Sequence, residues 1–378
     1  MKPFIYTRLL LLIALLFAGA GLAAQQQETE PNNSIMTADT VQLGGEFSGM
    51  LSDNSDRDFV TFFVPRPGVI EASALLNQGI VNAELSLFDA SPPVGTGLDL
   101  NVSNQESAGV VSLAYLICVP GYYVLRIRRG SGGTANMSPY TLLVELNESD
   151  QHECNQNNNT ATPITAGQTV TGAVYPQSQD RDVFKMTVSV AGTFKFRATN
   201  IAADFNLLVE ASGPGLSGFS RSGADELSFN RKVCEPGIYY FILSRGSGSS
   251  PNIAGTYDFH IDFYTDDIFE CNDDLSGPLT VVDCDTIYGS IFPDNDDDYI
   301  PFRAPAPGSY NIIVRDLEAP VFIVGHVIDE FNSSFGPTVG ANFAGASINV
   351  PFMITDASKT YYLHLMNATS SGSSEDLY

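Results

Sequence analysis

Three stretches of the chain share one pattern of apolar and polar positions. Each starts at an acidic turn, continues with apolar residues at every second position, and then reaches a glycine. The turns occupy residues 56–58, 180–182 and 296–298, and the glycines are Gly68, Gly192 and Gly308. The alternating apolar residues are Val60, Phe62 and Val64, then Phe184, Met186 and Val188, then Ile300, Phe302 and Ala304. A period of two is typical of a β-strand with one buried face, so the pattern predicts one core strand in each stretch.

Other features recur at matching places. A glycine precedes each turn (Gly49, Gly172 and Gly289), and we expect it to make a bend or bulge. Residues 118–123 and 234–239 both read Cys-x-Pro-Gly-x-Tyr. Pro-Gly indicates a turn, and the apolar alternation after it predicts another strand. In the third copy that strand falls on Tyr361, Leu363 and Leu365.

A closing strand is expected at Tyr140 in the first copy and at Tyr257 in the second. The same spacing leads to Tyr378, the last residue of the sequence. The third copy is therefore expected without its final strand. Either the sequence is a fragment, or the neighbouring strand is left open for pairing.

The repeat is as long as a domain and carries no helical periodicity. Short strands alternate with Gly, Pro, Asn and Asp, which is typical of sandwiches. We expect an all-β protein of three tandem β-sandwich or jelly-roll domains, at residues 25–148, 149–264 and 265–378.

The first 24 residues have the pattern of an export signal. Lys2 and Arg8 make a basic start, residues 9–20 are apolar, and small residues precede Gln25. We expect a secreted or periplasmic protein without a membrane span. The chain has 378 residues, of which 44% are hydrophobic, and a formal net charge of −25. Such a charge argues against nucleic acid as a partner and is compatible with binding of cations.

Each copy offers oxygen ligands in two segments, which together suit Ca²⁺. The candidate ligands are Glu28, Glu30, Asn32, Asp56 and Asp58 in the first copy, Glu153, Asn155, Asp180 and Asp182 in the second, and Glu270, Asn272, Asp296 and Asp298 in the third. The alternative is that Asp and Asn only stabilise turns through bonds to the backbone. The run before Tyr299 is not an EF-hand, because Tyr299 occupies the glycine position.

The five cysteines allow two pairing schemes. We favour Cys118 with Cys154 and Cys234 with Cys271, since late cysteines then pair with the next early one and Cys284 is left over. The alternative pairs Cys154 with Cys234 and Cys271 with Cys284.

Sequence motifs of catalysis are missing. The four histidines form no His-Glu-x-x-His, and the sequence contains neither a Gly-x-Ser-x-Gly elbow nor a phosphate-binding Gly-x-x-x-x-Gly-Lys. We therefore expect a protein that is not an enzyme.

The landmarks together resemble the bacterial pre-peptidase C-terminal domain, which is related to the collagen-binding domains of clostridial collagenases. The matching features are residues 28–33, Gly49, the turn at 56–59, Gly68, residues 120–123 and Tyr140, with Glu-Cys-Asn at 153–155 and 270–272 in the later copies. The resemblance implies a β-sandwich module that accompanies secreted peptidases or occurs in tandem, and that in some members binds calcium. The third copy departs from the pattern, because it lacks Pro-Gly before Tyr361.

We expect a secreted, non-catalytic binding or display protein, stabilised by calcium, that contacts an extracellular protein or polysaccharide. The alternative is an accessory region of a larger or partner exported peptidase or hydrolase.

Overall fold

The computed structural model describes residues 26–76, 81–90, 98–104, 109–135, 137–175, 180–249, 254–265, 271–272, 274–275, 286–291, 297–315, 322–341, 345, 347–367 and 376–377. The predicted signal peptide, Glu270, Cys284, Asp296 and Tyr378 lie outside these residues. The chain divides into two compact units, Met1–Cys154 and Asn155–Tyr378.

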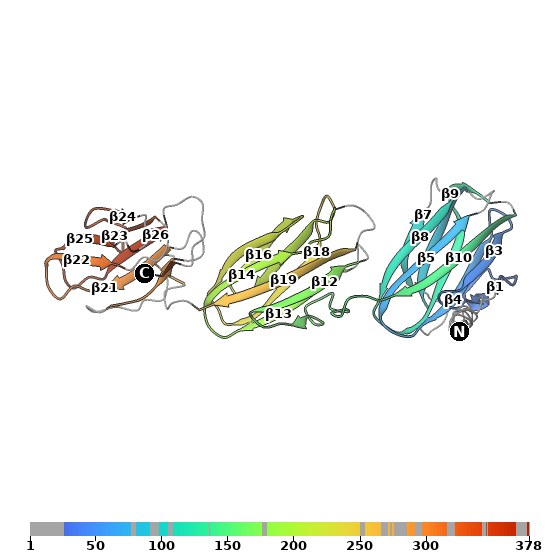
Figure 1. The fold of residues 1–378 in the computed structure, drawn as a ribbon, viewed down its shortest axis with the longest axis horizontal. Helices are drawn as coiled ribbons and strands as arrows, with labels where there is room; N and C mark the ends of the chain where they lie inside the picture. Colours follow the sequence, from blue (N-terminus) through green and yellow to red (C-terminus); the bar gives the residue numbers. More distant parts are fainter. Residues whose placement is uncertain are drawn as a thin grey trace, which may run out of the picture. The chain divides into compact units, whose positions relative to one another are not determined.

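The first unit is a sandwich of two five-stranded sheets (Figure 1). One sheet has the order β1 (Gln26–Gln27), β3 (Glu46–Leu51), β10 (Ser138–Asn147), β5 (Gly68–Leu76) and β8 (Val110–Ile117). The other has the order β2 (Asp39–Thr40), β4 (Arg57–Val64), β9 (Gly121–Thr134), β6 (Val81–Asp89) and β7 (Leu98–Asn104), and a short 3-10 helix, η1 (Ile35–Thr37), follows β1 along the chain. The first predicted core strand is β4, and Val60, Phe62 and Val64 are buried in the core between the sheets.

The second unit begins with a second sandwich. One sheet has the order β11 (Thr162–Pro163), β13 (Asp182–Val188), β18 (Gly237–Arg245), β15 (Leu207–Gly213) and β16 (Leu216–Gly223). The other has the order β12 (Gln168–Val174), β19 (Gly255–Tyr264), β14 (Gly192–Thr199) and β17 (Leu227–Val233). The core is rich in aromatic side chains, and the rings of Phe196 and Phe259 stack with centroids 5.1 Å apart.

The remaining strands of the second unit surround a separate core. A four-stranded sheet has the order β21 (Asp297–Phe302), β26 (Tyr361–Asn367), β23 (Ile323–Asp329) and β24 (Val339–Ala341). Two smaller sheets pair β22 (Gly308–Val314) with β25 (Ile348–Ile354) and β20 (Ser290–Ile291) with β27 (Asp376–Leu377). Tyr361, Leu363 and Leu365 are buried on β26, as their alternation predicts, whereas Phe302 is only partly buried.

One antiparallel pairing occurs in all three sets of strands. β4 pairs with β9, β13 with β18 and β21 with β26. The last aspartate of each acidic turn lies opposite an apolar residue: Asp58 opposite Ile127, Asp182 opposite Leu243, and Asp298 opposite Leu365. The sheets described above confirm the predicted all-β class, with β-sandwich architecture. The predicted boundaries at residues 148 and 264 stay predictions.

Two disulfide bonds join Cys118 to Cys154 and Cys234 to Cys271, which is the pairing scheme that we favoured. The part of the chain that the structure describes contains no helix with the length and apolar character of a membrane span.

Candidate metal centre

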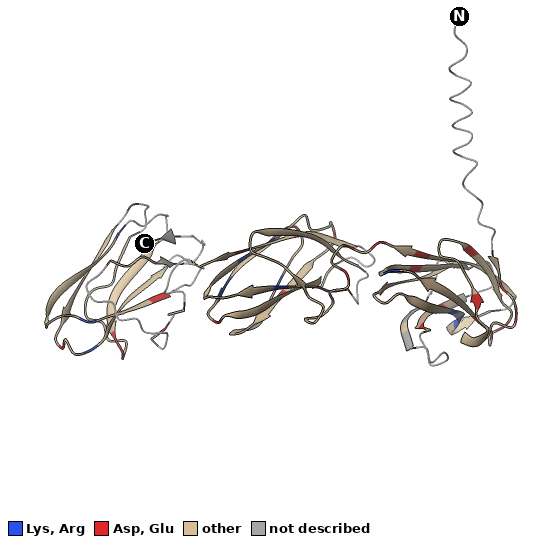
Figure 2. Cartoon of the chain, turned by 90° about the horizontal axis from the view of Figure 1, so that it is seen from below, with Lys and Arg blue, Asp and Glu red and all other residues tan. Residues whose placement is uncertain are grey.

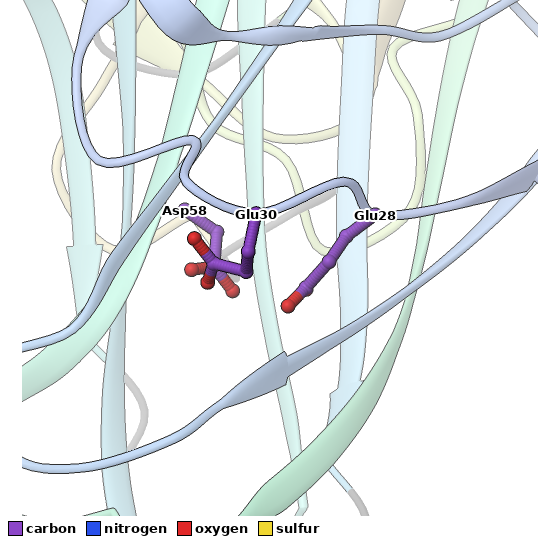
Figure 3. Close-up of side chains that lie close together, drawn as sticks. All are labelled: Glu28, Glu30 and Asp58. Atoms are coloured by element: carbon purple, nitrogen blue, oxygen red, sulfur yellow. The ribbon is translucent and has the colours of Figure 1, made fainter.

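The two segments that the sequence suggests as ligands meet in the first unit. Glu28 and Glu30 follow β1, and Asp58 lies near the start of β4. Their side chains point toward one another (Figure 3), and one ligand oxygen from each lies within 4.8 Å of the others. Asp58 is fully buried, Glu28 is half-buried and Glu30 is exposed, so the cluster reaches from the interior to the surface.

Backbone hydrogen bonds hold these segments in place. Glu28 N donates to Ser48 O at 2.9 Å, which ties the segment after β1 to β3. Phe59 N donates to Asn32 O at 3.1 Å, which ties the same segment to β4. The carboxylates are therefore brought together by strand pairing on both sides of the segment.

Gly49 makes room for the cluster. A Cβ atom at this position would collide with the hydroxyl of Tyr140 and the carboxylate of Glu28. The sequence predicted a bend or bulge here, but Gly49 lies within β3 and pairs regularly with Tyr140. The requirement for glycine is thus a close approach of side chains to the backbone.

Part of the cluster is satisfied by hydrogen bonds. Tyr140 Oη donates to Asp58 Oδ2 at 2.8 Å, Met50 N donates to Glu28 Oε2 at 2.6 Å, and Asn32 N donates to Glu30 Oε2 at 3.0 Å. Among the described residues, no donor reaches Asp58 Oδ1 or Asn32 Oδ1, and both atoms are buried. Buried acceptors without a donor are costly, so these two oxygens fit a site that receives a cation.

The electrostatics of the cluster also favour a cation. Burial raises the pKa of Asp58 from 3.8 to about 8, and the charge of Glu28 adds to the effect. Burial likewise raises the pKa of Glu28 from 4.5 to about 7, with further contributions from Glu30, Asp56 and Asp39. Without a cation, these carboxyl groups therefore hold protons near neutral pH, since crowded carboxylates repel one another in a poorly solvated place.

The carboxylate of Asp56, which the sequence suggested as a candidate ligand, accepts backbone hydrogen bonds. Its Oδ2 accepts a hydrogen bond from Ser52 N at 2.6 Å, and its Oδ1 accepts one from Arg57 N at 2.9 Å. Asp56 thus closes the acidic turn and is not among the three carboxylates whose oxygens converge. Its charge still raises the pKa of Glu28 and Asp58.

The structure adds two residues that the sequence did not single out as neighbours of the site. Tyr140 was predicted as the start of a strand and as one of the landmarks of the resemblance, and its hydroxyl donates a hydrogen bond to Asp58. Asp39 accepts hydrogen bonds from Thr29 N at 3.0 Å and from Asn32 Nδ2 at 3.2 Å. The amide of Asn32 is thereby oriented by Asp39, which leaves its Oδ1 available.

The second copy repeats part of this framework. Asn155, Asp180 and Asp182 are buried in the second unit, whereas Glu153 belongs to the first unit. Val183 N donates to Asn155 O at 3.2 Å, and Tyr257 Oη donates to Asp182 Oδ2 at 2.6 Å. Asp180 Oδ2 accepts from Tyr175 N at 2.6 Å, so Asp180 closes its turn as Asp56 does.

The third copy is described only in part. Asn272 and Asp298 are buried, and Tyr299 N donates to Asn272 O at 3.2 Å, as the equivalent residues do in the other copies. Glu270 and Asp296 lie outside the described residues. In the first copy, by contrast, all of the candidate ligands lie within the described residues of one unit.

The donor set of the first copy consists of oxygens only. Carboxylates and an amide carbonyl are typical ligands of hard cations such as Ca²⁺, whereas zinc sites usually include Cys or His. Figure 2 shows acidic and basic residues along the strands, and in the whole sequence 43 Asp and Glu outnumber 18 Lys and Arg. A cation is thus favoured both by the local ligands and by the charge of the chain.

Comparisons with known proteins gave matches among solved structures alone. No family model matches the chain, and no curated protein matches it. The pre-peptidase C-terminal domain of a collagenase from Bacillus anthracis is 20% identical with a TM-score of 0.25, and the match covers 31% of this chain and 100% of that domain.

Two other solved structures show weaker similarity. The PBSX exported protein XepA is 10% identical with a TM-score of 0.18, and the match covers 59% of this chain and 83% of that one. A Clostridium perfringens ZmpB structure, with an M60 catalytic domain and two CBM51 domains, is 5% identical with a TM-score of 0.17, covering 55% of this chain and 33% of that one. Similarities at this level assign neither a family nor a function to the chain.

Proposed function

We propose that the chain is a secreted, non-catalytic binding or display protein whose first β-sandwich is stabilised by Ca²⁺. The observation that carries the proposal is the convergence of Glu28, Glu30 and Asp58 beside two buried oxygens that lack donors. Asp58 Oδ1 and Asn32 Oδ1 are the inner candidate ligands, and the carboxylates of Glu28 and Glu30 complete the set toward the surface. Water would supply the remaining positions of a six- to eight-coordinate ion.

The proposed role of the ion is structural. Glu28, Glu30 and Asn32 belong to the segment between β1 and η1, and Asp58 belongs to β4. An ion bound by both segments would neutralise their mutual repulsion and link the N-terminal segment to the sandwich. The first unit would then be more stable and less open to proteolysis at its N-terminal end.

The two disulfide bonds support export. Cys118–Cys154 and Cys234–Cys271 persist in oxidising compartments such as the periplasm or the extracellular medium. The basic and apolar start of the sequence supports the same location.

An exposed aromatic pair supports contact with a partner. Phe63 on β4 and Tyr122 on β9 lie opposite each other, with ring centroids 5.1 Å apart, and are 49% and 58% exposed. Exposed aromatic rings suit the apolar faces of sugars or the side chains of a protein. We therefore assign the partner to extracellular proteins or polysaccharides.

The second candidate function is an accessory region of an exported peptidase or hydrolase. The resemblance of the landmark residues to the pre-peptidase C-terminal domain favours it. Sequencing the gene and its neighbours would discriminate the two candidates, because a peptidase or hydrolase domain encoded with this chain would favour the accessory role.

Thermal unfolding with and without Ca²⁺ tests the proposed function. The protein is stripped with a chelator and then measured at increasing Ca²⁺, with Mg²⁺ as the matched control. Because a ligand of the native state must stabilise it, we expect the unfolding temperature of the first unit to rise with Ca²⁺. An unchanged transition at about 10 mM Ca²⁺, on the order of ten times the weakest affinity typical of extracellular calcium modules, would remove the calcium proposal.

A further inference from the structure

A surface pocket of about 430 Å³ lies beside β13 and β18 of the second sandwich. Its floor consists of Val183, which is buried, and Ile242, which is half-buried. Both alternate with core residues along their strands and therefore belong to the outer face of the sheet. Its rim consists of residues 156–159 and the half-exposed Arg181, so the whole pocket belongs to the second unit.

The equivalent place in the first sandwich is filled by apolar side chains. Phe59, Phe88 and Val124 form a small cluster outside the main core, and Ile35 packs against it. The rings of Phe59 and Phe88 have centroids 6.4 Å apart. The segment after Asn32 thus covers the outer face of this sheet with an apolar contact.

The second sandwich lacks most of this filling. The hydrogen bond from Val183 N to Asn155 O matches the one from Phe59 N to Asn32 O, and the strand pairings match as well. A smaller or polar residue stands at three of the equivalent positions: Asn158 for Ile35, Val183 for Phe59 and Ser212 for Phe88. Tyr240, which stands for Val124, is not among the residues that line the pocket. The pocket is therefore explained by lost apolar volume.

The polar rim is held in place by hydrogen bonds. Asn157 Oδ1 accepts a bond from Asn159 N at 3.0 Å, which fixes the turn that carries the rim. Arg181 Nη2 donates to Glu210 Oε2 at 3.1 Å. Within the described residues, the carboxamides of Asn158 and Asn159 are engaged in no hydrogen bond. These two groups are consequently available to a ligand.

The chemistry of the pocket suits a neutral sugar. A carboxamide both donates and accepts hydrogen bonds, as a sugar hydroxyl does, and an aliphatic floor suits the C–H face of a sugar ring. The charge of Arg181 is offset by Glu210, and the net charge of −25 disfavours acidic sugars. The volume lies in the lower part of the range of about 300–1,000 Å³ for small-molecule pockets.

An extended peptide fits this place less well. Peptides that add a strand to a sheet need a bare strand edge. β13 lies between β11 and β18, and Val183 N is already bonded to Asn155 O. The pocket offers side-chain amides on a sheet face instead of main-chain groups on an edge.

We propose that this pocket binds a sugar unit of a neutral polysaccharide. The ring lies against Val183 and Ile242, and its hydroxyls exchange hydrogen bonds with Asn158 and Asn159 and accept from Arg181. This inference rests on the proposed function, of which it narrows the partner from extracellular proteins or polysaccharides to one class.

Calorimetric titration of the full chain in excess Ca²⁺ tests the pocket. The probes are neutral pentasaccharides of glucose, mannose, galactose or N-acetylglucosamine, and a tryptic digest of casein represents peptides. Asn158→Ile restores the side chain that fills the first sandwich, and Ser212→Phe restores a second one. Asn349→Ile is the matched control, because Asn349 is an exposed asparagine on β25.

At least one pentasaccharide is expected to bind with a dissociation constant on the order of 1 mM or tighter. Asn158→Ile is expected to weaken this binding by ~10-fold or more, because the added side chain occupies the pocket, and Asn349→Ile is expected to leave it unchanged. Should Asn158→Ile fail to fold in a thermal scan, Ser212→Phe gives the same readout.

Binding of none of the pentasaccharides would overturn the proposal, and so would equal binding to the wild type and the pocket variants. Casein peptides that bind the wild type but not Asn158→Ile would assign the pocket to proteins, which contradicts this inference and leaves the proposed function standing. The calcium-dependent unfolding of the first unit is a separate measurement, so failure of the calcium proposal is recognised independently.

Discussion

The substitution Asp58→Asn separates the two roles that the structure gives to this carboxyl group. The introduced amide keeps an acceptor for the Tyr140 hydroxyl but carries no charge toward Glu28 and Glu30. A rise of the pKa of Asp58 from 3.8 to about 8 corresponds to about 6 kcal/mol of unfavourable free energy for its ionised form. Because the pKa is raised on folding, the contribution of Asp58 to stability is fully present below about pH 4 and is lost as the pH rises through about 8.

In the metal-free wild type, the titration of Asp58 by itself makes the free energy of unfolding decrease as the pH rises from about 4 to about 9. The Asp58→Asn protein lacks that titration, so its stability is expected to fall less over the same interval. In the presence of Ca²⁺, the wild type is expected to be stabilised more than the Asp58→Asn protein. At a Ca²⁺ concentration about one hundred times the dissociation constant, the wild type gains about 2.7 kcal/mol, which is on the order of 10 °C for a unit of this size. The variant is expected to lose most of this gain.

Differential scanning calorimetry of both proteins, with chelator and with Ca²⁺, measures these effects. Glu46→Gln is the matched control, because Glu46 is an exposed carboxylate at the start of β3 outside the cluster. The control is expected to keep the wild-type response to Ca²⁺. A full calcium-induced shift in the Asp58→Asn protein would refute the assignment of this carboxylate as a ligand.

Three further variants test the surroundings of the site and the Cys118–Cys154 bond. Gly49→Ala places a methyl group against Tyr140 and Glu28, so urea unfolding should show a loss of ~1–3 kcal/mol together with weaker Ca²⁺ binding. Tyr140→Phe removes the side-chain donor to the cluster, and its expected cost is ~1–3 kcal/mol; an unchanged unfolding midpoint would contradict the role of the hydroxyl. Replacing Cys118 and Cys154 by serine removes a bond that spans 36 residues, so thermal scans of the variant and the wild type under oxidising conditions should show a loss of ~3–4 kcal/mol; equal stability of the two proteins would argue against the bond.

The strands could be predicted from the sequence because one face of each strand is buried, which makes apolar residues recur at every second position. Val60, Phe62 and Val64 alternate with polar or less buried positions, and the structure places all three in the core. The same reasoning located the strand at Tyr361 although no Pro-Gly precedes it, because its apolar residues recur with period two.

The cysteine pairing could also be predicted, for a different reason. The first copy lacks the early cysteine and the third lacks the late one, so pairing each late cysteine with the next early one uses four of the five. Cys118–Cys154 and Cys234–Cys271 follow that rule. The rule depends only on the order of the copies and needs no knowledge of the fold.

The candidate site was harder to predict, because its geometry depends on contacts between distant strands. Sequence spacing treats Asp56 and Asp58 alike, yet Asp56 accepts two backbone hydrogen bonds while Asp58 faces Glu28 and Tyr140. The need for glycine at position 49 also arises from side chains that come from other parts of the chain. The spacing of residues along the sequence does not show which side chains from distant strands come into contact.

Isothermal titration of the chelator-treated protein with Ca²⁺, at about pH 7 in buffers of different ionisation enthalpy, tests the central claim most directly. Because Asp58 and Glu28 have pKa values of about 8 and about 7 in the metal-free protein, binding near pH 7 is expected to be saturable and to release about one proton per ion, with the release vanishing well above about pH 8. Absence of calcium-dependent heat in every buffer, or binding that releases no proton at neutral pH, would contradict the account.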